Sequence, residues 1–340
     1  VMHSFAAEPD CEITHICDVR DPVRRQRGAE MKQKTGRMPK LVNDYRTLLD
    51  DKSVDVFMVA TPDHWHALAT VTACQAKKDV YVEKPASHNI HEGRIAVTAA
   101  RKHKRVVQHG SQMRSSAVTA AAGKLLAEGI IGEVRISKAW NVQRRGTRKV
   151  VADTRPPAGV DYDRWLGPAP VRGFNINRFH GNWRVYRDYG NGEIGDDGIH
   201  DIDMARWGLG NNLLPSKVSA GGGRMILHGH ASDYPDNMVV RYEFPDGKVM
   251  VYENYPFTAY GMHGFDNGNV FYGTKGYMIF SRRGAFSVFL GPKNKKGPTE
   301  GRDIRGERGY AEHMAEFFNA VRNRTPTKAN PQTAHRSCAL

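Results

Sequence analysis

Short apolar runs alternate with helical patterns over the first third of the chain. Four of these runs are apolar at nearly every position, which is typical of strands buried on both faces of a parallel sheet. They are residues 13–17, 54–60, 79–82 and 105–108. Three stretches with helical spacing of apolar residues separate them, at residues 22–35, 65–76 and 91–102. This alternation predicts an α/β fold with a doubly wound parallel sheet.

The pattern changes after a further helical stretch at residues 117–128. Six later stretches look like strands and have few helices between them, and many of them are rich in Val, Tyr and Phe and bounded by Gly, Pro, Asp or Asn. They are residues 133–141, 217–221, 237–244, 248–255, 268–272 and 277–281. The sequence PDG at residues 245–247 indicates a hairpin between two of them. We therefore expect a first domain over residues 1–112 and a second α/β domain over residues 113–340 with a large open antiparallel sheet.

Composition and charge argue against several kinds of binding partner. The chain has 340 residues and a net charge of +14, but its basic residues are dispersed and are not interleaved with aromatic residues as in single-strand nucleic-acid binders. No apolar run approaches the ~20 residues of a membrane span. His64 and His66 have no third ligand nearby and no CxxC pair occurs, so no metal site is predicted. We expect a small-molecule ligand, and neither nucleic acid nor a membrane span.

The first predicted strand ends at Asp18. In a dinucleotide-binding unit, an acid at this place ends the second strand and binds the ribose 2′-hydroxyl. The first strand and its GxGxxG phosphate loop belong roughly 20 residues earlier, and no such motif follows a strand in this chain. We therefore expect the natural protein to carry a further N-terminal segment with that strand and loop. Any signal peptide would lie there too, so the compartment, exported or periplasmic against cytoplasmic, is left open.

Two motifs follow strands of the predicted parallel sheet. ATPDHWH occupies residues 60–66, and EKP occupies residues 83–85. An open α/β sheet binds its ligand at the carboxyl ends of its strands. The ammonium of Lys84 can there bond a substrate hydroxyl or carbonyl and favour oxyanion character. The alternatives are a capped strand-to-helix turn for the first motif and an exposed charged turn for the second.

A third motif, GNGEIGDDGIHDIDMARW, occupies residues 190–207. If the chain is helical from residue 196, Asp196, His200 and Asp203 share one face. A carboxylate one turn from a histidine can orient the imidazole and stabilise its protonated form, as a general base requires. The alternative is a histidine in an ordinary contact between helices.

Together these motifs resemble the Gfo/Idh/MocA family, the glucose–fructose oxidoreductase and inositol dehydrogenase group. The resemblance covers nearly the whole chain and rests on CDVR, ATPDHWH, VEKP, HDIDMARW, FYGTKG and EFFNAVRNRTP. It implies a Rossmann domain, here without its first strand and Gly-rich loop, followed by an α/β domain with a large open sheet. It also implies a homodimer or homotetramer.

The resemblance implies a role for each matching residue. The implied catalytic residues are Lys84, Asp196 and His200. The implied cofactor contacts are Asp18, Arg20, Ala60, Thr61, Pro62, His66, Glu83, Lys84 and Gln112. The implied substrate contacts are Arg114, Trp183, Tyr189 and Asp197. The Lys84–Pro85 peptide is often cis in this family, and NAD is the implied cofactor. The Asp18 carboxylate would repel a 2′-phosphate, while Arg20 and Arg24 keep NADP possible.

The implied reaction is hydride transfer between a nicotinamide cofactor and a secondary hydroxyl of a sugar or polyol. An alternative within the same fold is a glycosidase or lyase that retains its cofactor, oxidises a sugar transiently and eliminates a substituent. Tyr162, Tyr186 and Tyr189 are candidates for its extra acid or base. A third possibility is a sugar or cofactor sensor without catalysis. The residues do not specify which sugar, or which of its carbons, is acted on.

Overall fold

The computed structural model describes residues 1–258, 261–298 and 309–340. Its N-terminal half contains five short parallel strands in two separate sheets. One sheet pairs β1 (His15–Cys17) with β2 (Lys40–Val42); the other has the order β3 (Val56–Val59), β4 (Asp79–Val82), β5 (Val107–His109). The helices here are α1 (Met2–Phe5), α2 (Asp21–Thr35), η1 (Tyr45–Leu48), α3 (Asp63–Gln75) and α4 (Ile90–Lys102). Strand and helix alternate as the sequence predicts.

Burial explains why these segments are nearly all apolar. All four residues of β4 are buried, because β4 lies between β3 and β5 and helices cover the sheet. Val80 and Val82 of β4 pack in one cluster with Val59 of β3 and Val107 of β5. Asn89 caps α4 by accepting a hydrogen bond from the backbone of Glu92 at 2.9 Å.

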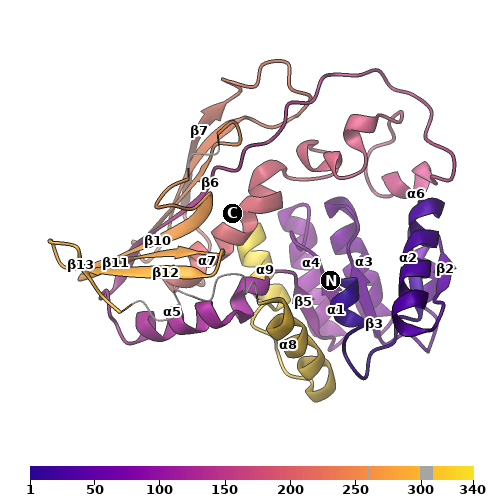
Figure 1. Ribbon diagram of the computed structural model, residues 1–340, viewed down its shortest axis with the longest axis horizontal. Helices are drawn as coiled ribbons and strands as arrows, with labels where there is room; N and C mark the ends of the chain where they lie inside the picture. The colour runs from indigo at the N-terminus through magenta and orange to yellow at the C-terminus, as the bar shows by residue number, and fades with distance from the viewer. Residues whose placement is uncertain (259–260, 299–308) are drawn as a thin grey trace.

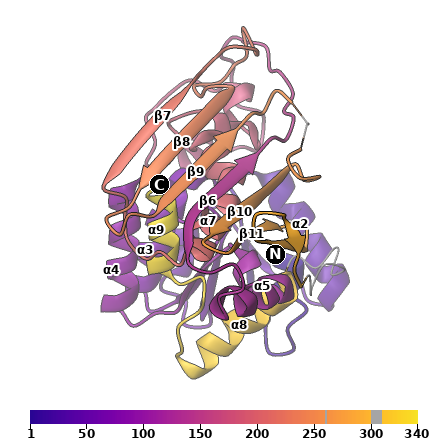
Figure 2. The same cartoon turned by 90° about the vertical axis from the view of Figure 1, so that its left-hand side faces the viewer.

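One large sheet dominates the C-terminal half (Figure 2). Its eight strands have the order β13-β12-β11-β10-β6-β9-β8-β7. Their bounds are β6 Val134–Asn141, β7 Lys217–Gly223, β8 Asn237–Glu243, β9 Val249–Asn254, β10 Asn267–Gly273, β11 Gly276–Ser281, β12 Ala285–Leu290 and β13 Lys295–Lys296. The sheet is mixed, which differs from the antiparallel sheet expected, because β6 and β9 pair in parallel. The neighbours β8 and β9 do form the predicted hairpin, whereas the parallel pair joins strands far apart along the chain.

Two helices, α5 (Ala117–Ala127) and α7 (Ile199–Leu209), pack on this sheet. Ten of the eleven residues of α7 are buried. A Cβ at Gly208 would lie 2.3 Å from a ring carbon of Phe271 in β10, so the close approach of helix and sheet requires glycine.

The C-terminal helices return to the N-terminal half (Figure 1). They are α8 (Tyr310–Asn323) and α9 (Pro331–Cys338). Phe317 and Phe318 of α8 pack with Phe5 and Tyr81, and α9 contacts α4. Between them, the backbone NH of His109 in β5 donates to the carbonyl of Ala329 at 2.9 Å. Residues far beyond the predicted boundary at 112/113 therefore help to hold the first half in place.

The segment between β6 and α7 runs across the upper edge of both halves in Figure 1. It contains α6 (Tyr162–Leu166), η3 (Ile176–Arg178), η4 (Asn182–Val185) and η5 (Ile194–Gly198), a π-helical turn that leads directly into α7. The carbonyl of Trp165 lies 3.0 Å from Nε2 of His64 and accepts a bond from Nε1 of Trp65 at 3.1 Å. These contacts fix the segment on α3. No helix among the described residues is long and apolar enough to cross a membrane.

Candidate active site

Lys84 and Asp196 join the two halves of the molecule. Lys84 follows β4, and its Nζ donates to Oδ1 of Asp196 at 2.6 Å and to the Asp196 carbonyl at 2.5 Å. Both side chains are about one-fifth exposed, so the pair borders open space. The Lys84–Pro85 peptide is cis, as the resemblance implies. The sequence places these residues 112 positions apart, and the fold brings them into direct contact.

The carboxylate of Asp196 does not serve His200 as expected. It bonds Lys84, and it also accepts from Nε of Arg184 at 3.0 Å. In a continuous α-helix, residues 196 and 200 would lie one above the other. Residues 194–198 instead form a π turn, whose wider spacing turns Asp196 away from His200 and toward the N-terminal half. The hydrogen bonds of Asp196 therefore orient the ammonium of Lys84 rather than the ring of His200.

His200, in the first turn of α7, is buried in a positively charged environment. Burial lowers its pKa well below the usual value, and the charges of Arg282 and Lys84 lower it further while Asp197 opposes them. The imidazole forms no hydrogen bond with any residue that the structure describes. These surroundings therefore favour the neutral ring, and its nitrogens are open to a ligand as far as the described residues show. The influence of Lys84 also shows that the two groups lie within electrostatic reach.

Arg282 is a part of this site that the sequence analysis missed. It follows β11, and its Nη2 lies 3.1 Å from Oδ1 of Asp197 while its Nε lies 3.4 Å from Oδ1 of Asp201. Although burial opposes it, the Arg282 charge contributes to holding the pKa of Asp197 below its usual range. Arg145 adds a second cation to Asp197 at 3.0 Å. The signal was available, since Arg282 directly follows a predicted strand, as Lys84 does.

Asp63 was expected only to cap a helix. It is the first residue of α3, is 2% exposed and makes no capping hydrogen bond. Burial raises its pKa well above the usual value, and the negative charge of Asp196 raises it further. Burial and the charge of Asp196 thus both favour the uncharged form of this carboxyl.

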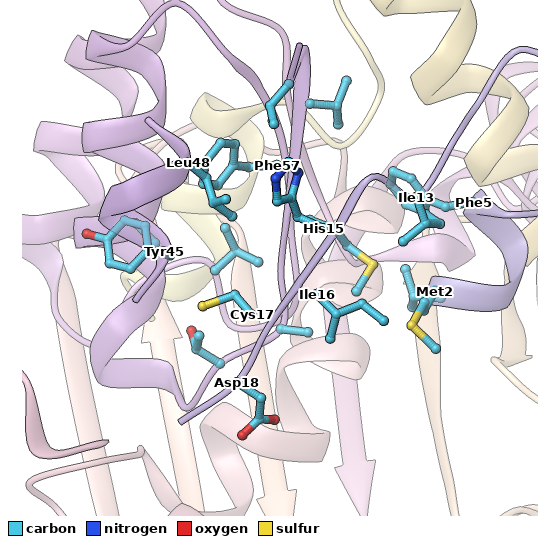
Figure 3. A pocket seen from close by; sticks show the side chains of 18 of the residues that line it. Met2, Phe5, Ile13, His15, Ile16, Cys17, Asp18, Tyr45, Leu48 and Phe57 are labelled. Atoms are coloured by element: carbon cyan, nitrogen blue, oxygen red, sulfur yellow. The ribbon is translucent and has the colours of Figure 1, made fainter. Parts of the chain in front are cut away.

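Five of the expected cofactor residues gather at one cavity. Asp18, Arg20, Ala60, Thr61 and Pro62 line a cavity of about 1230 Å³ between β1 and β3. Figure 3 shows Ile16 and Cys17 of β1 and Phe57 of β3 around this space, with Asp18 at the end of β1.

The residues at this cavity fit the ribose and nicotinamide parts of a dinucleotide. Oδ1 of Asp18 accepts from the backbone of Arg20 at 2.8 Å, which fixes the carboxylate at the strand end where a ribose hydroxyl binds. No GxGxxG loop follows a strand in the chain, so the described residues supply no phosphate-binding turn of that kind.

The other expected cofactor residues lie away from this cavity. Nδ1 of His66 faces the carbonyl of Pro85 at 2.6 Å and its Nε2 faces that of Thr61 at 2.8 Å. The ring thus joins the two strand-end loops and has no nitrogen left for a ligand. Glu83 and Gln112 also lie outside the cavity lining.

The expected substrate residues divide into two groups. Asp197 lines a second cavity, of about 350 Å³, next to Asp196. Arg114 is committed elsewhere, since its guanidinium holds both oxygens of Asp203, at 2.7 and 2.8 Å. Trp183 and Tyr189 are buried in the aromatic cluster around Trp165. Their large apolar surface explains their burial, and the structure does not bring them to the second cavity.

The comparisons with known proteins agree with this geometry. Residues 2–111 match the family model described as "Oxidoreductase family, NAD-binding Rossmann fold". Residues 119–274 match "Oxidoreductase family, C-terminal alpha/beta domain" of the same Gfo/Idh/MocA group. The predicted cofactor, NAD, is thereby confirmed at the level of the family.

Similar curated proteins include several oxidoreductases. Uncharacterized oxidoreductase YrbE of Bacillus subtilis is 27% identical, over 69% of this chain and 58% of its own length. Myo-inositol 2-dehydrogenase of Thermotoga maritima is 25% identical, over 89% of this chain and 80% of its own. 2,7-Anhydro-N-acetylneuraminate hydratase of Escherichia coli is 24% identical, over 61% of this chain and 47% of its own length. The matched part thus covers less than two thirds of the length of YrbE and of the hydratase.

Solved structures show the same fold. A levoglucosan dehydrogenase in complex with NADH superposes with a TM-score of 0.74 at 20% identity, over 98% of this chain and 89% of that one. Both domain matches, the strand order and the meeting of Lys84 with the second half point the same way. The chain belongs to the Gfo/Idh/MocA family of oxidoreductases.

Proposed function

We propose that this protein is an NAD-dependent dehydrogenase acting on a secondary hydroxyl of a sugar or polyol. The observation that carries the proposal is the Lys84–Asp196 contact, which holds an ammonium from the first half within electrostatic reach of His200 in the second. Relatives named as sugar and polyol dehydrogenases support the substrate class. The assignment of residues 1–112 to the cofactor and 113–340 to the substrate belongs to the same proposal, and a homodimer or homotetramer stays a prediction.

The nicotinamide cofactor of the family supplies a hydride acceptor when it is bound. The chain supplies the positioning and the proton transfer. His200 takes the hydroxyl proton, because its surroundings favour the neutral ring and no described residue bonds the imidazole. Lys84 bonds the same oxygen and stabilises its negative charge as the proton leaves. Asp196 fixes Nζ of Lys84 for this contact.

The surroundings of Asp18 favour NAD over NADP. Its carboxylate lies where the ribose 2′-hydroxyl binds and would repel a phosphate there. The two arginines that kept NADP possible both have partners within the protein. Nη1 of Arg20 lies 2.9 Å from Nδ1 of His180. Arg24 donates to the carbonyl of Asp18 and to Asp21, both at 2.6 Å.

The test is turnover of a sugar and polyol panel with NAD and NADP by His200→Asn and Lys84→Met variants. We expect kcat to fall by about 10²–10⁴-fold in each, because a positioned proton acceptor or oxyanion partner is lost. NADH affinity should change little. His91→Asn, at an exposed side chain of α4 that lines neither cavity, is the matched control. Turnover that survives both substitutions would contradict the proposal.

A second candidate is a lyase or hydratase that oxidises its sugar transiently and keeps the cofactor. Two observations favour it: a relative named as an anhydro-sugar hydratase, and the buried Asp63 carboxyl, whose pKa is raised by burial and by the charge of Asp196. Such an enzyme makes product with no net NADH, whereas a dehydrogenase makes one NADH for each product. Product mass measured together with absorbance of the nicotinamide distinguishes the two.

A further inference from the structure

The cavity of about 350 Å³ extends the site away from the parallel sheet. Asp196, Asp197 and Arg184 line the end nearest Lys84. Arg148, Arg224 and His230 also line it, and they come from the segment after β6 and the segment between β7 and β8. Its volume is in the range of pockets that hold a small ligand such as a monosaccharide.

The arginines of this cavity differ in what they bind. Arg145 pairs with Glu193 at 2.8 Å and Asp197 at 3.0 Å, and Arg184 pairs with Asp196 at 3.0 Å. Arg148 forms no side-chain hydrogen bond or ion pair within the described residues. Arg224 bonds only the carbonyl of Ser232, which carries no charge. Two guanidinium groups therefore border the cavity without a carboxylate partner of their own.

Of the four acids that line this cavity, three pair with Arg145 or Arg184, and the fourth, Asp236, is bonded by the backbone of its own loop. The carboxylate of Asp236 accepts hydrogen bonds from the backbone of Met225, Ile226 and Leu227, at 2.9, 2.8 and 2.6 Å. The Asn237 amide adds a fourth bond at 3.1 Å. Asp236 thus organises the loop that carries Arg224, and it offsets at most one of the two free positive charges.

His230 provides a third donor. Its Nδ1 accepts from the backbone NH of Arg148 at 2.8 Å, so the proton of the neutral ring is on Nε2. Burial lowers the pKa of His230, and the charges of Arg148 and Arg224 lower it further. Both guanidiniums consequently act on the same imidazole, and the three donors form one group.

We propose that Arg148, Arg224 and His230 bind an anionic substituent of the substrate: a carboxylate, sulfate or phosphate. The inference rests on the proposed function, which places the reacting hydroxyl at Lys84 and His200. Two unpaired guanidiniums repel each other, and an anion between them removes that repulsion and gains charge-assisted hydrogen bonds. The substrate class is therefore a sugar acid or sugar ester anion rather than a neutral sugar.

The test compares sugars that differ only in charge. The panel pairs hexoses of gluco, galacto and manno configuration with their hexuronates, 6-sulfates and 6-phosphates, which separates the three anions. For the preferred anion, Arg148→Gln and Arg224→Gln should each lower kcat/KM by roughly 10- to 100-fold, as expected for a lost charged hydrogen bond. Turnover of the neutral hexose should stay the same. The control is Arg101→Gln on α4, whose side chain bonds Gln332 outside this cavity.

Binding of the same sugars, measured by calorimetry without turnover, separates this inference from the proposed function. Binding of one anion that depends on Arg148, with no NADH formed, would support the anion site and contradict the dehydrogenase. Equal turnover of charged and neutral sugars, unchanged in both arginine variants, would overturn the anion site and leave the dehydrogenase standing. Absence of binding by any anionic sugar would also overturn it.

Discussion

Arg114 shows how a correctly located residue can have a different role from the expected one. The sequence placed it where the chain crosses between the halves, as a substrate contact. In the structure its guanidinium binds Asp203 of α7 through two bonds, and Asp203 also accepts from Ser337 of α9 at 2.6 Å. Asp203 is 1% exposed, so this network is buried. It joins the crossover, α7 and the C-terminal helix.

We therefore predict that Arg114→Gln lowers stability and leaves substrate affinity unchanged. Removing one partner leaves the Asp203 charge buried and unpaired, which costs about 3–5 kcal/mol in free energy of unfolding. Urea denaturation measures this loss. Arg135→Gln is the control, because Arg135 pairs with Glu133 at an exposed position and should contribute less than about 1 kcal/mol. An increased KM with unchanged stability would contradict this prediction and would support a substrate-binding role for Arg114.

At the same scale, the sequence motifs located the candidate residues better than the partners of those residues. Lys84 and His200 each lie within a recognisable motif, and the fold brings Lys84 to Asp196, which precedes His200 by one turn. Their catalytic roles stay predictions. The partner of Asp196 was not predictable, because the switch from α-helix to π turn at residues 194–198 depends on tertiary packing. A Cβ at Gly198 would lie 2.2 Å from the hydroxyl of Tyr252 in β9, a contact that no local pattern reveals.

At the scale of elements, the sequence predicted strands and helices well where the pattern was long. Helices α2, α3, α4 and α5 begin and end within two residues of the predicted ranges. The strand β2 was missed because it has only three residues and none is buried. The parallel pairing of β6 with β9 was missed because a pairing across more than 100 residues leaves no local signal.

The parallel strands of the N-terminal half form two sheets, and the edges of β1 and β3 that face each other are unpaired among the described residues. Among the described residues, β1 pairs only with β2, and β3 pairs only with β4. The facing edges line the cavity of about 1230 Å³, so buried backbone groups there have no strand partner. The two sheets therefore stay separate among the described residues, in contrast to the single parallel sheet that the sequence predicts.

At the scale of the whole molecule, buried histidines hold the halves together. Nε2 of His313 in α8 lies 2.9 Å from the carbonyl of His109 in β5, and its Nδ1 lies 2.9 Å from the hydroxyl of Ser115. His64 and His66 join α3 to the loops above it. Burial lowers the pKa of His64, His66 and His313 to about 4 and that of His109 to about 3.

These histidines make the fold sensitive to acid in a defined window. In the unfolded chain each has a pKa near 6.5, so between about pH 6.5 and 4 the unfolded state binds more protons than the folded state. Stability is then complete above about pH 6.5 and falls as the pH drops through that window, by roughly 1 kcal/mol per histidine and pH unit. Urea denaturation at pH 7.5, 6.0 and 5.0 measures the slope. His313→Gln should reduce it and His3→Gln, at an exposed site, should not. A stability that stays constant from pH 7.5 to 5.0 would show that these rings are already charged in the folded protein.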